Sequence, residues 1–333
     1  MASMAGHDFK AAWWIPGPHL QTLWQPLFRR EPRPAVERES LRTPDGDFID
    51  LDWLGPDDQP IVVLLHGLSG SSRSPYIRGL QHRMAALGWR TLAMNFRGCG
   101  GRPNLTWRSY HSGETRDFDW VIKSLRGRYP DQPVTAVGFS LGGNVLLKWL
   151  GEQGARADLK AAVAVSVPLR LDLCAKRLNR GLSRLYRDRL LHELKGYVAD
   201  KCQHLQSLGR DEEARRLVDL GDLSPIRTFR EYDDRVVARL YGFRDAEDYY
   251  DQSSSRQFLN RIRRPTLLIQ AHDDPFMTPE ALPAASELSP CVQLEVTRTG
   301  GHVGFVSGRR PWRPDYWLER RIPEYLSQVM AAA

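Results

Sequence analysis

Short apolar runs alternate along this chain with segments in which apolar residues recur at helical spacing. The runs are six or seven residues long and lie at 61–67, 91–96, 134–139, 161–167, 266–271 and 292–297. Continuous runs of this kind are typical of strands that are covered on both faces. The helical pattern occupies 75–88, 115–128, 141–154, about 279–288 and the chain from about 313. Strands that alternate with helices predict an α/β fold with a mostly parallel central sheet wrapped by helices.

The alternation stops after Pro168 and resumes near residue 265. The intervening residues 169–264 are charged, helical in pattern and poor in strand signals, so they predict a helical cap inserted between two strands of one sheet. The core domain then comprises 36–168 and 265–333. Residues 1–35 are rich in Trp and Pro, and they predict an irregular N-terminal arm with about one helical turn.

Composition is that of an ordinary globular protein, with 41% hydrophobic and 26% charged residues among 333. The four cysteines have neither a CxxC spacing nor a zinc-type spacing with histidine, which predicts reduced thiols and no metal site. The N-terminus lacks the apolar core of a signal peptide, and no run approaches the roughly 20 apolar residues of a membrane-spanning helix. These features predict a cytoplasmic protein.

Positive charge is unevenly distributed. The net charge is +7, and residues 175–191 are the densest basic segment. A solvated helix face is the favoured interpretation, with contact to anionic headgroups or acidic substrates as the alternative. No nucleic-acid recognition motif accompanies the charge, so we expect no nucleic-acid partner. Peripheral membrane contact, through this segment or the Trp-rich arm, stays open, and the oligomeric state is unknown.

The motif Gly-Phe-Ser-Leu-Gly at 138–142 joins a predicted strand to a predicted helix. So sharp a turn forces strained backbone angles on Ser140 and requires neighbours without side chains, which Gly138 and Gly142 provide. The turn lifts the hydroxyl above the carboxyl edge of the sheet, where the N-terminus of the next helix favours negative charge. Ser140 is therefore the candidate nucleophile.

A serine hydroxyl needs a base that is oriented by a carboxylate, and after this motif the acid and then the histidine follow along the chain. His302 lies in a glycine-flanked loop beyond the strand predicted at 292–297, which favours it over the other histidines. Asp273 and Asp274 both come directly after the strand predicted at 266–271. Adjacent side chains point differently, so we expect only one to meet the imidazole. We favour Asp274, with Asp273 bracing the loop through hydrogen bonds.

An acyl-transfer site also needs two preorganised donors for the oxyanion. The N–H of Leu141, directly after the nucleophile, is one candidate, and the N–H of Leu68, after the first buried strand, is the other. His66 and Gly67 are expected to shape that loop. Arg97 lies in a glycine-rich loop whose spacing does not match a dinucleotide fingerprint, and we favour an anchoring role for it over contact with a substrate anion.

These motifs resemble the YheT-like branch of the α/β-hydrolase superfamily. The superfamily resemblance rests on HGLSG, GFSLGG, DDPF and GGH, and the branch resemblance rests on PHLQTLW, NFRGCGG, YHSGETRDF and the pattern from RLYGFRD to QAHDD. It implies the α/β-hydrolase fold, a serine hydrolase of carboxylic esters, and Asp274 as the acid. Substrates vary widely across the family, so the resemblance does not identify the ester.

The sequence thus predicts a serine hydrolase that cleaves short- to medium-chain or lipid-like carboxylic esters. It would use a Ser140–His302–Asp274 triad, an acyl-enzyme intermediate and no cofactor. Two alternatives remain: an acyltransferase that passes the acyl group to an alcohol with the same triad, and a non-catalytic binding module on the same fold.

The predicted cap would roof the site and select the acyl chain. Apolar cap residues are the candidate walls of an acyl pocket, and we single out Leu182, Leu185, Tyr186 and Tyr241.

Overall fold

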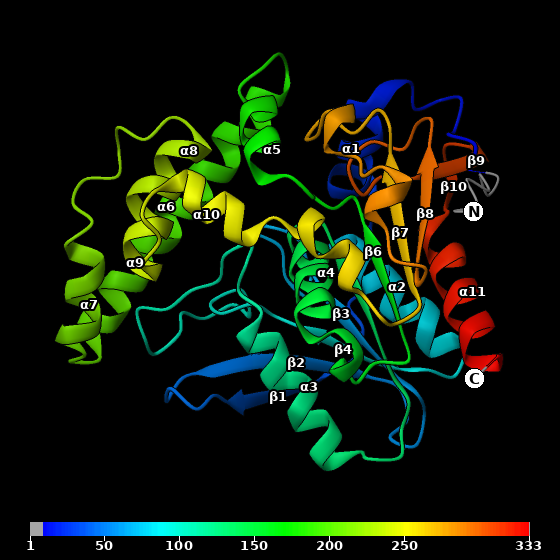
Figure 1. Ribbon diagram of the computed structural model, residues 1–333, viewed down its shortest axis with the longest axis horizontal. Helices are drawn as coiled ribbons and strands as arrows, with labels where there is room; N and C mark the ends of the chain where they lie inside the picture. Colours follow the sequence, from blue (N-terminus) through cyan, green and yellow to red (C-terminus); the bar gives the residue numbers. More distant parts are fainter. Residues whose placement is uncertain (1–8, 333) are drawn as a thin grey trace.

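An eight-stranded sheet forms the centre of the computed structural model, which describes residues 9–332 (Figure 1). Its spatial order is β1-β2-β4-β3-β5-β6-β7-β8. The first two pairings are antiparallel and all the others are parallel. The predicted α/β class and mostly parallel sheet are confirmed. The strands are β1 (Glu37–Arg42), β2 (Phe48–Leu54), β3 (Ile61–Leu65), β4 (Arg90–Met94), β5 (Val134–Phe139), β6 (Ala161–Val165), β7 (Thr266–Ala271) and β8 (Val292–Thr297).

Helices cover both faces of this sheet, which explains why its strands read as unbroken apolar runs. Every residue of β3 to β7 is buried. On one face lie α3 (Arg116–Arg128) and α4 (Leu141–Gln153), whose apolar residues join one core cluster. On the other face lie α2 (Pro75–Ala86) and α11 (Leu318–Ala331), which join a second cluster.

The chain between β6 and β7 is entirely without strands. Its helices are α5 (Leu171–Leu178), α6 (Ser183–Ser207), α7 (Asp211–Val218), α8 (Phe229–Tyr232), α9 (Arg239–Tyr241) and α10 (Ala246–Ser253), with a π-helical turn at Asp233–Ala238 and a 3₁₀ helix at Ser255–Arg261. Apolar residues of these helices form a cluster of their own. Figure 1 shows them beside the sheet, with α5 at the upper edge to which the strands' carboxyl ends point. The division into arm, core and cap stays a prediction.

The N-terminal arm differs from the single helical turn expected. A 12-residue helix, α1 (Gly17–Phe28), occupies it, and Gln21 and Gln25 are its buried residues. Both glutamines donate to backbone carbonyls of the core, Gln21 to Val306 and Gln25 to Val303 and Gly304. Because its fully buried positions are polar, the apolar pattern did not mark this helix. The part of the predicted arm before residue 9 lies outside the described residues.

Two expectations near the C-terminus are wrong. The segment 279–288 forms two 3₁₀ turns, Pro279–Ala281 and Ala285–Glu287, instead of one helix. Pro283 lies between them, and it lacks the N–H that a continuous helix needs. The last helix begins at Leu318 rather than near 313, because β9 (Val306–Arg310) and β10 (Arg313–Tyr316) pair as an antiparallel hairpin before it.

Within residues 9–332, none of the helices is both long enough and apolar enough to cross a membrane. The cytoplasmic location stays a prediction.

Candidate active site

Ser140 occupies the tight turn between β5 and α4, with φ 52° and ψ −118°. Its N–H donates to the carbonyl of Val165, at 2.8 Å. A Cβ on Gly138 would lie 2.5 Å from the carbonyl oxygen of Gly142, and one on Gly142 would lie 2.5 Å from that of His66. Such contacts are too close for any side chain. The strained serine and its two glycine neighbours therefore have the geometry that the motif requires.

The imidazole of His302 connects this hydroxyl to a carboxylate. His302 Nε2 lies 2.9 Å from Ser140 Oγ, and His302 Nδ1 lies 2.8 Å from Asp274 Oδ2. Asp274 is buried, and its second carboxylate oxygen accepts a hydrogen bond from the N–H of Phe276 at 2.8 Å. The fold thus brings Ser140, His302 and Asp274 into one continuous hydrogen-bonded array.

The neighbouring carboxylate, Asp273, points elsewhere. Its Oδ1 accepts a hydrogen bond from the N–H of Gly301 at 2.9 Å. Burial raises the pKa of Asp273, and the nearby charge of Asp274 acts in the same direction. The structure therefore places Asp274 at the imidazole and Asp273 at the backbone of the loop that carries His302.

Two neighbours of His302 were not anticipated from the sequence. The ring of Phe276 stacks on the imidazole, with centroids 4.1 Å apart and planes 5° apart. From α1, Thr22 Oγ1 accepts from the His302 N–H at 2.9 Å. Gln25 Nε2 donates to the carbonyls of Val303 and Gly304, at 3.0 and 3.1 Å. The only sequence signal was the PHLQTLW motif, which carried no structural meaning by itself.

The loop after β3 passes directly beside Ser140. A Cβ on Gly67 would lie 3.2 Å from the Ser140 Cβ. His66 is buried, and its Nε2 accepts from the N–H of Phe96 at 3.1 Å, so the proton is on Nδ1, which faces the Gly67 carbonyl at 2.7 Å. Burial lowers the pKa of His66 to about 4. The neutral ring thereby holds the shape of this loop at neutral pH.

Leu68 and Leu141 both line the cavity that contains Ser140. The N–H groups of Gly67, Ser69 and Gly70 are each used in a hydrogen bond within the protein, whereas the described residues supply no acceptor for that of Leu68. Leu141 is the first residue of α4, so its N–H has no carbonyl one turn earlier in the helix. Both amides are therefore free to bind a ligand oxygen.

A cavity of about 450 Å³ opens above this array, between the core and the helices that follow β6. Tyr186 and Tyr241 line it, as expected. Leu182 and Leu185 do not, because they stand at the corner where α6 begins and are 61% and 68% exposed. Their assignment to an acyl pocket was wrong.

Ionisable side chains also line this largely apolar cavity, among them Lys201 and Asp233. Lys201 is buried, its Nζ donates to the carbonyl of Arg108, and burial lowers its pKa to about 7. Asp233 begins the π-helical turn and accepts from the Tyr250 hydroxyl at 2.7 Å, and burial raises its pKa to about 7. The sequence pattern marked neither residue, because both lie on helices that looked like solvated surface.

Arg97 lies below the cavity and anchors loops. Its guanidinium donates to Asp117 at 2.7 and 2.8 Å, to Asp45 at 2.8 Å and to Asp47 at 3.1 Å. It is buried and does not line the cavity. Anchoring, the favoured role, is the one that its contacts fulfil.

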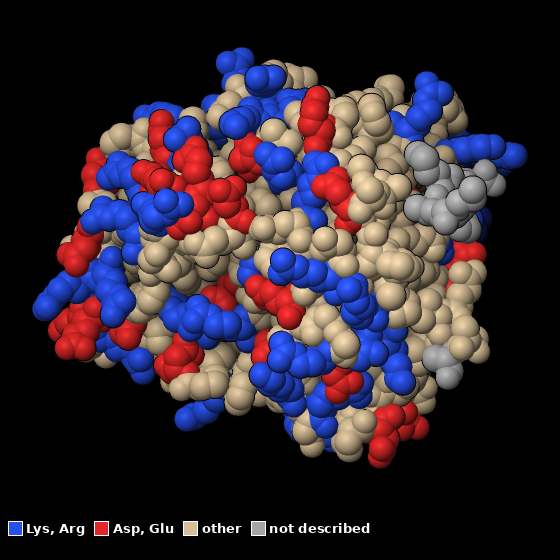
Figure 2. Space-filling model, in the orientation of Figure 1, with Lys and Arg blue, Asp and Glu red and all other residues tan. Residues whose placement is uncertain are grey.

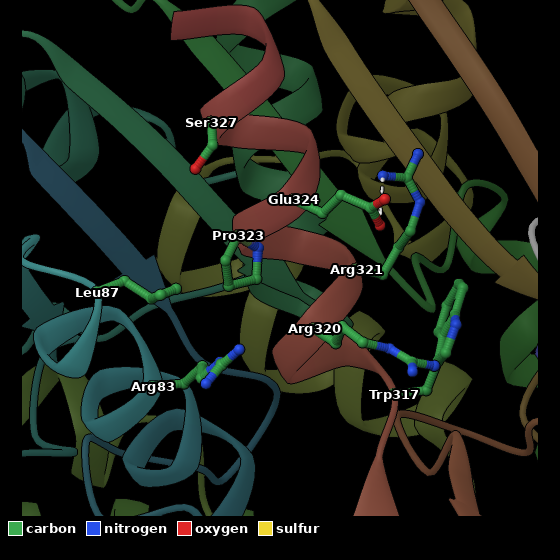
Figure 3. Close-up of a pocket in the computed structure, with 8 residues that line it drawn as sticks. All are labelled: Arg83, Leu87, Trp317, Arg320, Arg321, Pro323, Glu324 and Ser327. Atoms are coloured by element: carbon green, nitrogen blue, oxygen red, sulfur yellow. Dashed lines mark ion pairs between the residues drawn. The ribbon is translucent and has the colours of Figure 1, made fainter. Parts of the chain in front are cut away.

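A second cavity of about 530 Å³ lies between α2 and α11 and shares no lining residue with the first (Figure 3). Arg83 faces it from α2, Arg320 faces it from α11, and Trp317 lies directly before α11. Ser327 is the one hydroxyl side chain that lines it, and no histidine is among the lining residues. Among the residues that the structure describes, no three His, Cys, Asp or Glu side chains are grouped closely enough to hold a metal ion. The cavity that contains Ser140 is therefore the candidate active site.

Comparison with known proteins shows the family to which the chain belongs. The family model described as alpha/beta hydrolase fold matches residues 60–308. The chain is 42% identical over 318 residues to YheT of Escherichia coli (strain K12), by name an esterase, covering 94% of this chain and 91% of that one. It is 31% identical to phospholipase ABHD3 of Bos taurus, over 93% of this chain and 76% of that protein. It is 32% identical to monoacylglycerol lipase of Saccharomyces cerevisiae, over 86% and 63%.

Solved structures show the same fold at lower identity. The esterase Pf2001 of Pyrococcus furiosus superposes with a TM-score of 0.55 at 19% identity, covering 98% of this chain and 99% of that one. The likeness in structure supports the fold, and the sequence matches, which extend over nearly the whole chain, support the family. The protein therefore belongs to the α/β-hydrolase family, in the group of ester hydrolases that contains YheT.

Proposed function

We propose that the protein hydrolyses carboxylic esters through a covalent acyl-enzyme formed on Ser140. The observation that carries the proposal is the continuous hydrogen-bonded array from Ser140 Oγ through His302 to Asp274. The names of the relatives, esterase, phospholipase and lipase, support ester hydrolysis as the reaction class.

In the acylation step, His302 Nε2 accepts the proton of Ser140 as the oxygen attacks the ester carbonyl. The Asp274 carboxylate keeps the His302 proton on Nδ1, so that Nε2 is a free acceptor, and it stabilises the imidazolium that forms. The N–H groups of Leu68 and Leu141 bind the oxyanion, and each donor of this kind lowers the barrier by about 3 kcal/mol. The alcohol then leaves with the proton from His302.

Deacylation repeats these steps with water as the nucleophile. His302 removes a proton from the water, the tetrahedral intermediate collapses, and Ser140 regains its proton as the carboxylic acid departs. An alcohol in place of water would give ester exchange. None of the relatives described above is named as a transferase, which favours hydrolysis.

The substrate class follows from the cavity. A volume of about 450 Å³ with mainly apolar walls suits one hydrocarbon chain of short to medium length, or part of a lipid. Aromatic side chains such as Tyr186 and Tyr241 supply much of that wall. We expect a small-molecule ester as substrate, no cofactor and no nucleic acid, in a reaction that takes place in the cytoplasm.

A fluorophosphonate probe combined with a panel of p-nitrophenyl esters tests the proposal. The wild-type protein should be labelled and should prefer one range of chain lengths, whereas Ser140→Ala should lose both the label and the hydrolysis. Ser109→Ala is the matched control, because Ser109 lines the same cavity but does not contact His302. Labelling that survives in Ser140→Ala would contradict the proposal, and equal rates from acetate to decanoate esters would contradict a defined acyl pocket.

A further inference from the structure

Apolar side chains that solvent reaches are found on α1 and at the start of α6, two helices whose residues also line the cavity. Leu20, Leu27 and Phe28 are on α1, Leu182 and Leu185 are at the corner between α5 and α6, and each is between 47% and 68% exposed. We call these five residues the mouth surface. Large apolar side chains that are exposed together indicate an interaction site.

The two halves of the mouth surface lie on helices that contact each other. His19 of α1 reaches Tyr186 in the first turn of α6, with His19 Nδ1 3.1 Å from the tyrosine oxygen and the rings stacked. Leu23 and Leu27 of α1 and Tyr186 of α6 line the cavity that contains Ser140. Figure 1 places α1 and α5 along the same edge of the molecule. Leu27 both lines the cavity and is 61% exposed, so the cavity reaches solvent beside α1, where α1 meets the start of α6.

Positive charge adjoins the mouth surface. Residues 175–191 carry six Lys and Arg and one Asp, and Figure 2 shows Lys and Arg gathered over α5. Arg177, Arg180 and Arg184 have no carboxylate within ion-pair distance among the described residues, whereas the other three cations each pair with one. Unpaired cations beside exposed leucines match the anionic headgroups and the hydrocarbon layer of a membrane surface.

We infer that the mouth surface and the basic 175–191 segment dock the protein on an anionic lipid bilayer, with the opening of the active-site cavity facing the lipid. The inference rests on the proposed ester hydrolysis and adds to it the place where the substrate is met. A lipid-like ester then enters between α1 and α6 without crossing water. A second copy of this chain is a poorer occupant, because it would bring two basic segments together.

Vesicle sedimentation of the full chain tests the inference directly. The wild-type protein should sediment with phosphatidylcholine vesicles that contain phosphatidylglycerol, and only weakly with phosphatidylcholine alone. Arg180→Glu combined with Arg184→Glu, and separately Leu182→Ser combined with Leu185→Ser, should each lower the partition coefficient on anionic vesicles at least about tenfold. These four residues do not line the cavity, so hydrolysis of a soluble p-nitrophenyl ester should stay unchanged.

Leu208→Ser combined with Val218→Ser is the matched control. These two residues are as exposed as the mouth surface but lie beyond the other end of the 25-residue helix α6, and their variant should bind vesicles like the wild type. Equal binding of all the variants, or a change in molar mass that only the mouth variants show in light scattering, would overturn the inference. If the vesicles bind but the soluble ester is not cleaved, docking stands and the proposed function fails.

Discussion

Replacing Gln25 by Leu should lower the turnover of a soluble ester by impairing the loop that holds the imidazole. Gln25 Nε2 donates to the carbonyls of Val303 and Gly304, directly after His302. Leucine is similar in size but offers no donor, so both buried carbonyls lose their hydrogen bonds. An unsatisfied buried group costs about 1–3 kcal/mol. With two such carbonyls, the native arrangement of the loop should lose roughly 2–6 kcal/mol. A displacement of about 1 Å at the chemistry costs roughly a hundredfold in rate.

The measurements are kcat and KM for a soluble p-nitrophenyl ester, together with Tm from circular dichroism. We expect kcat to fall between about tenfold and a hundredfold. Gln25 also lines the cavity, so the fall in kcat, and not a change in KM, is the readout that reports on the loop. Gln81→Leu is the matched control. Gln81 is also buried on a helix and donates to Asp52 O and Thr91 Oγ1, so its loss should lower Tm without lowering kcat. If both variants lose similar Tm and both keep the wild-type kcat, α1 merely stabilises the fold and the reasoning is refuted.

Three other changes separate the roles of individual residues. Asp274→Asn should lower kcat by roughly 10⁴-fold, because it favours the wrong tautomer of His302. Asp273→Asn keeps an acceptor for the Gly301 N–H, so it should change steady-state rates by no more than about a few fold. Comparable losses in both variants would contradict the assignment. Asp233→Asn should raise Tm at pH 8 and change it little at pH 4. Burial raises the pKa of Asp233 to about 7, so as the pH rises this carboxyl ionises in the unfolded chain before it ionises in the folded protein. The wild type therefore loses stability between about pH 4 and pH 7, by a few kcal/mol at most. A Tm difference that is the same at both pH values would argue against this. Gly142→Ala should abolish soluble expression or labelling, because the added Cβ would lie 2.5 Å from a backbone carbonyl oxygen. Gly127→Ala on α3 is the control and should fold normally, because the space around Gly127 is open. A soluble, labelled alanine variant at 142 would show that the turn tolerates a side chain.

Much of the candidate site was accessible from the sequence because its positions follow local rules. Ser140 is marked by two glycines and by the junction of a strand with a helix. Asp274 and His302 each follow a strand that ends at the same edge of the sheet. The choice between Asp273 and Asp274, in contrast, depended on the direction of two adjacent side chains. We favour Asp274, and the family pattern agrees, but only the hydrogen bond to His302 Nδ1 distinguishes the two side chains.

The assignment of Leu182 and Leu185 to a pocket wall shows where local reasoning failed. Both are apolar and both belong to the segment that covers the site, yet they face solvent. Lys201 and Asp233 look like surface residues in the sequence, yet both are buried and line the cavity. Which face of a helix meets the cavity depends on how the helices pack on one another, and the weak amphipathic pattern of α6 does not specify it.

The sequence by itself determined the class of the fold, the positions along the chain of the strands that carry the functional groups, and the nucleophilic turn. Apolar periodicity and glycine positions suffice for these features because each depends on residues that are close together in the sequence. Tertiary structure alone decided how the histidine is held. Thr22 and His302 are 280 positions apart, and Phe276 reaches the imidazole only after its loop has folded over it. Such contacts join segments whose meeting depends on the packing of the whole core, and no local pattern encodes that packing.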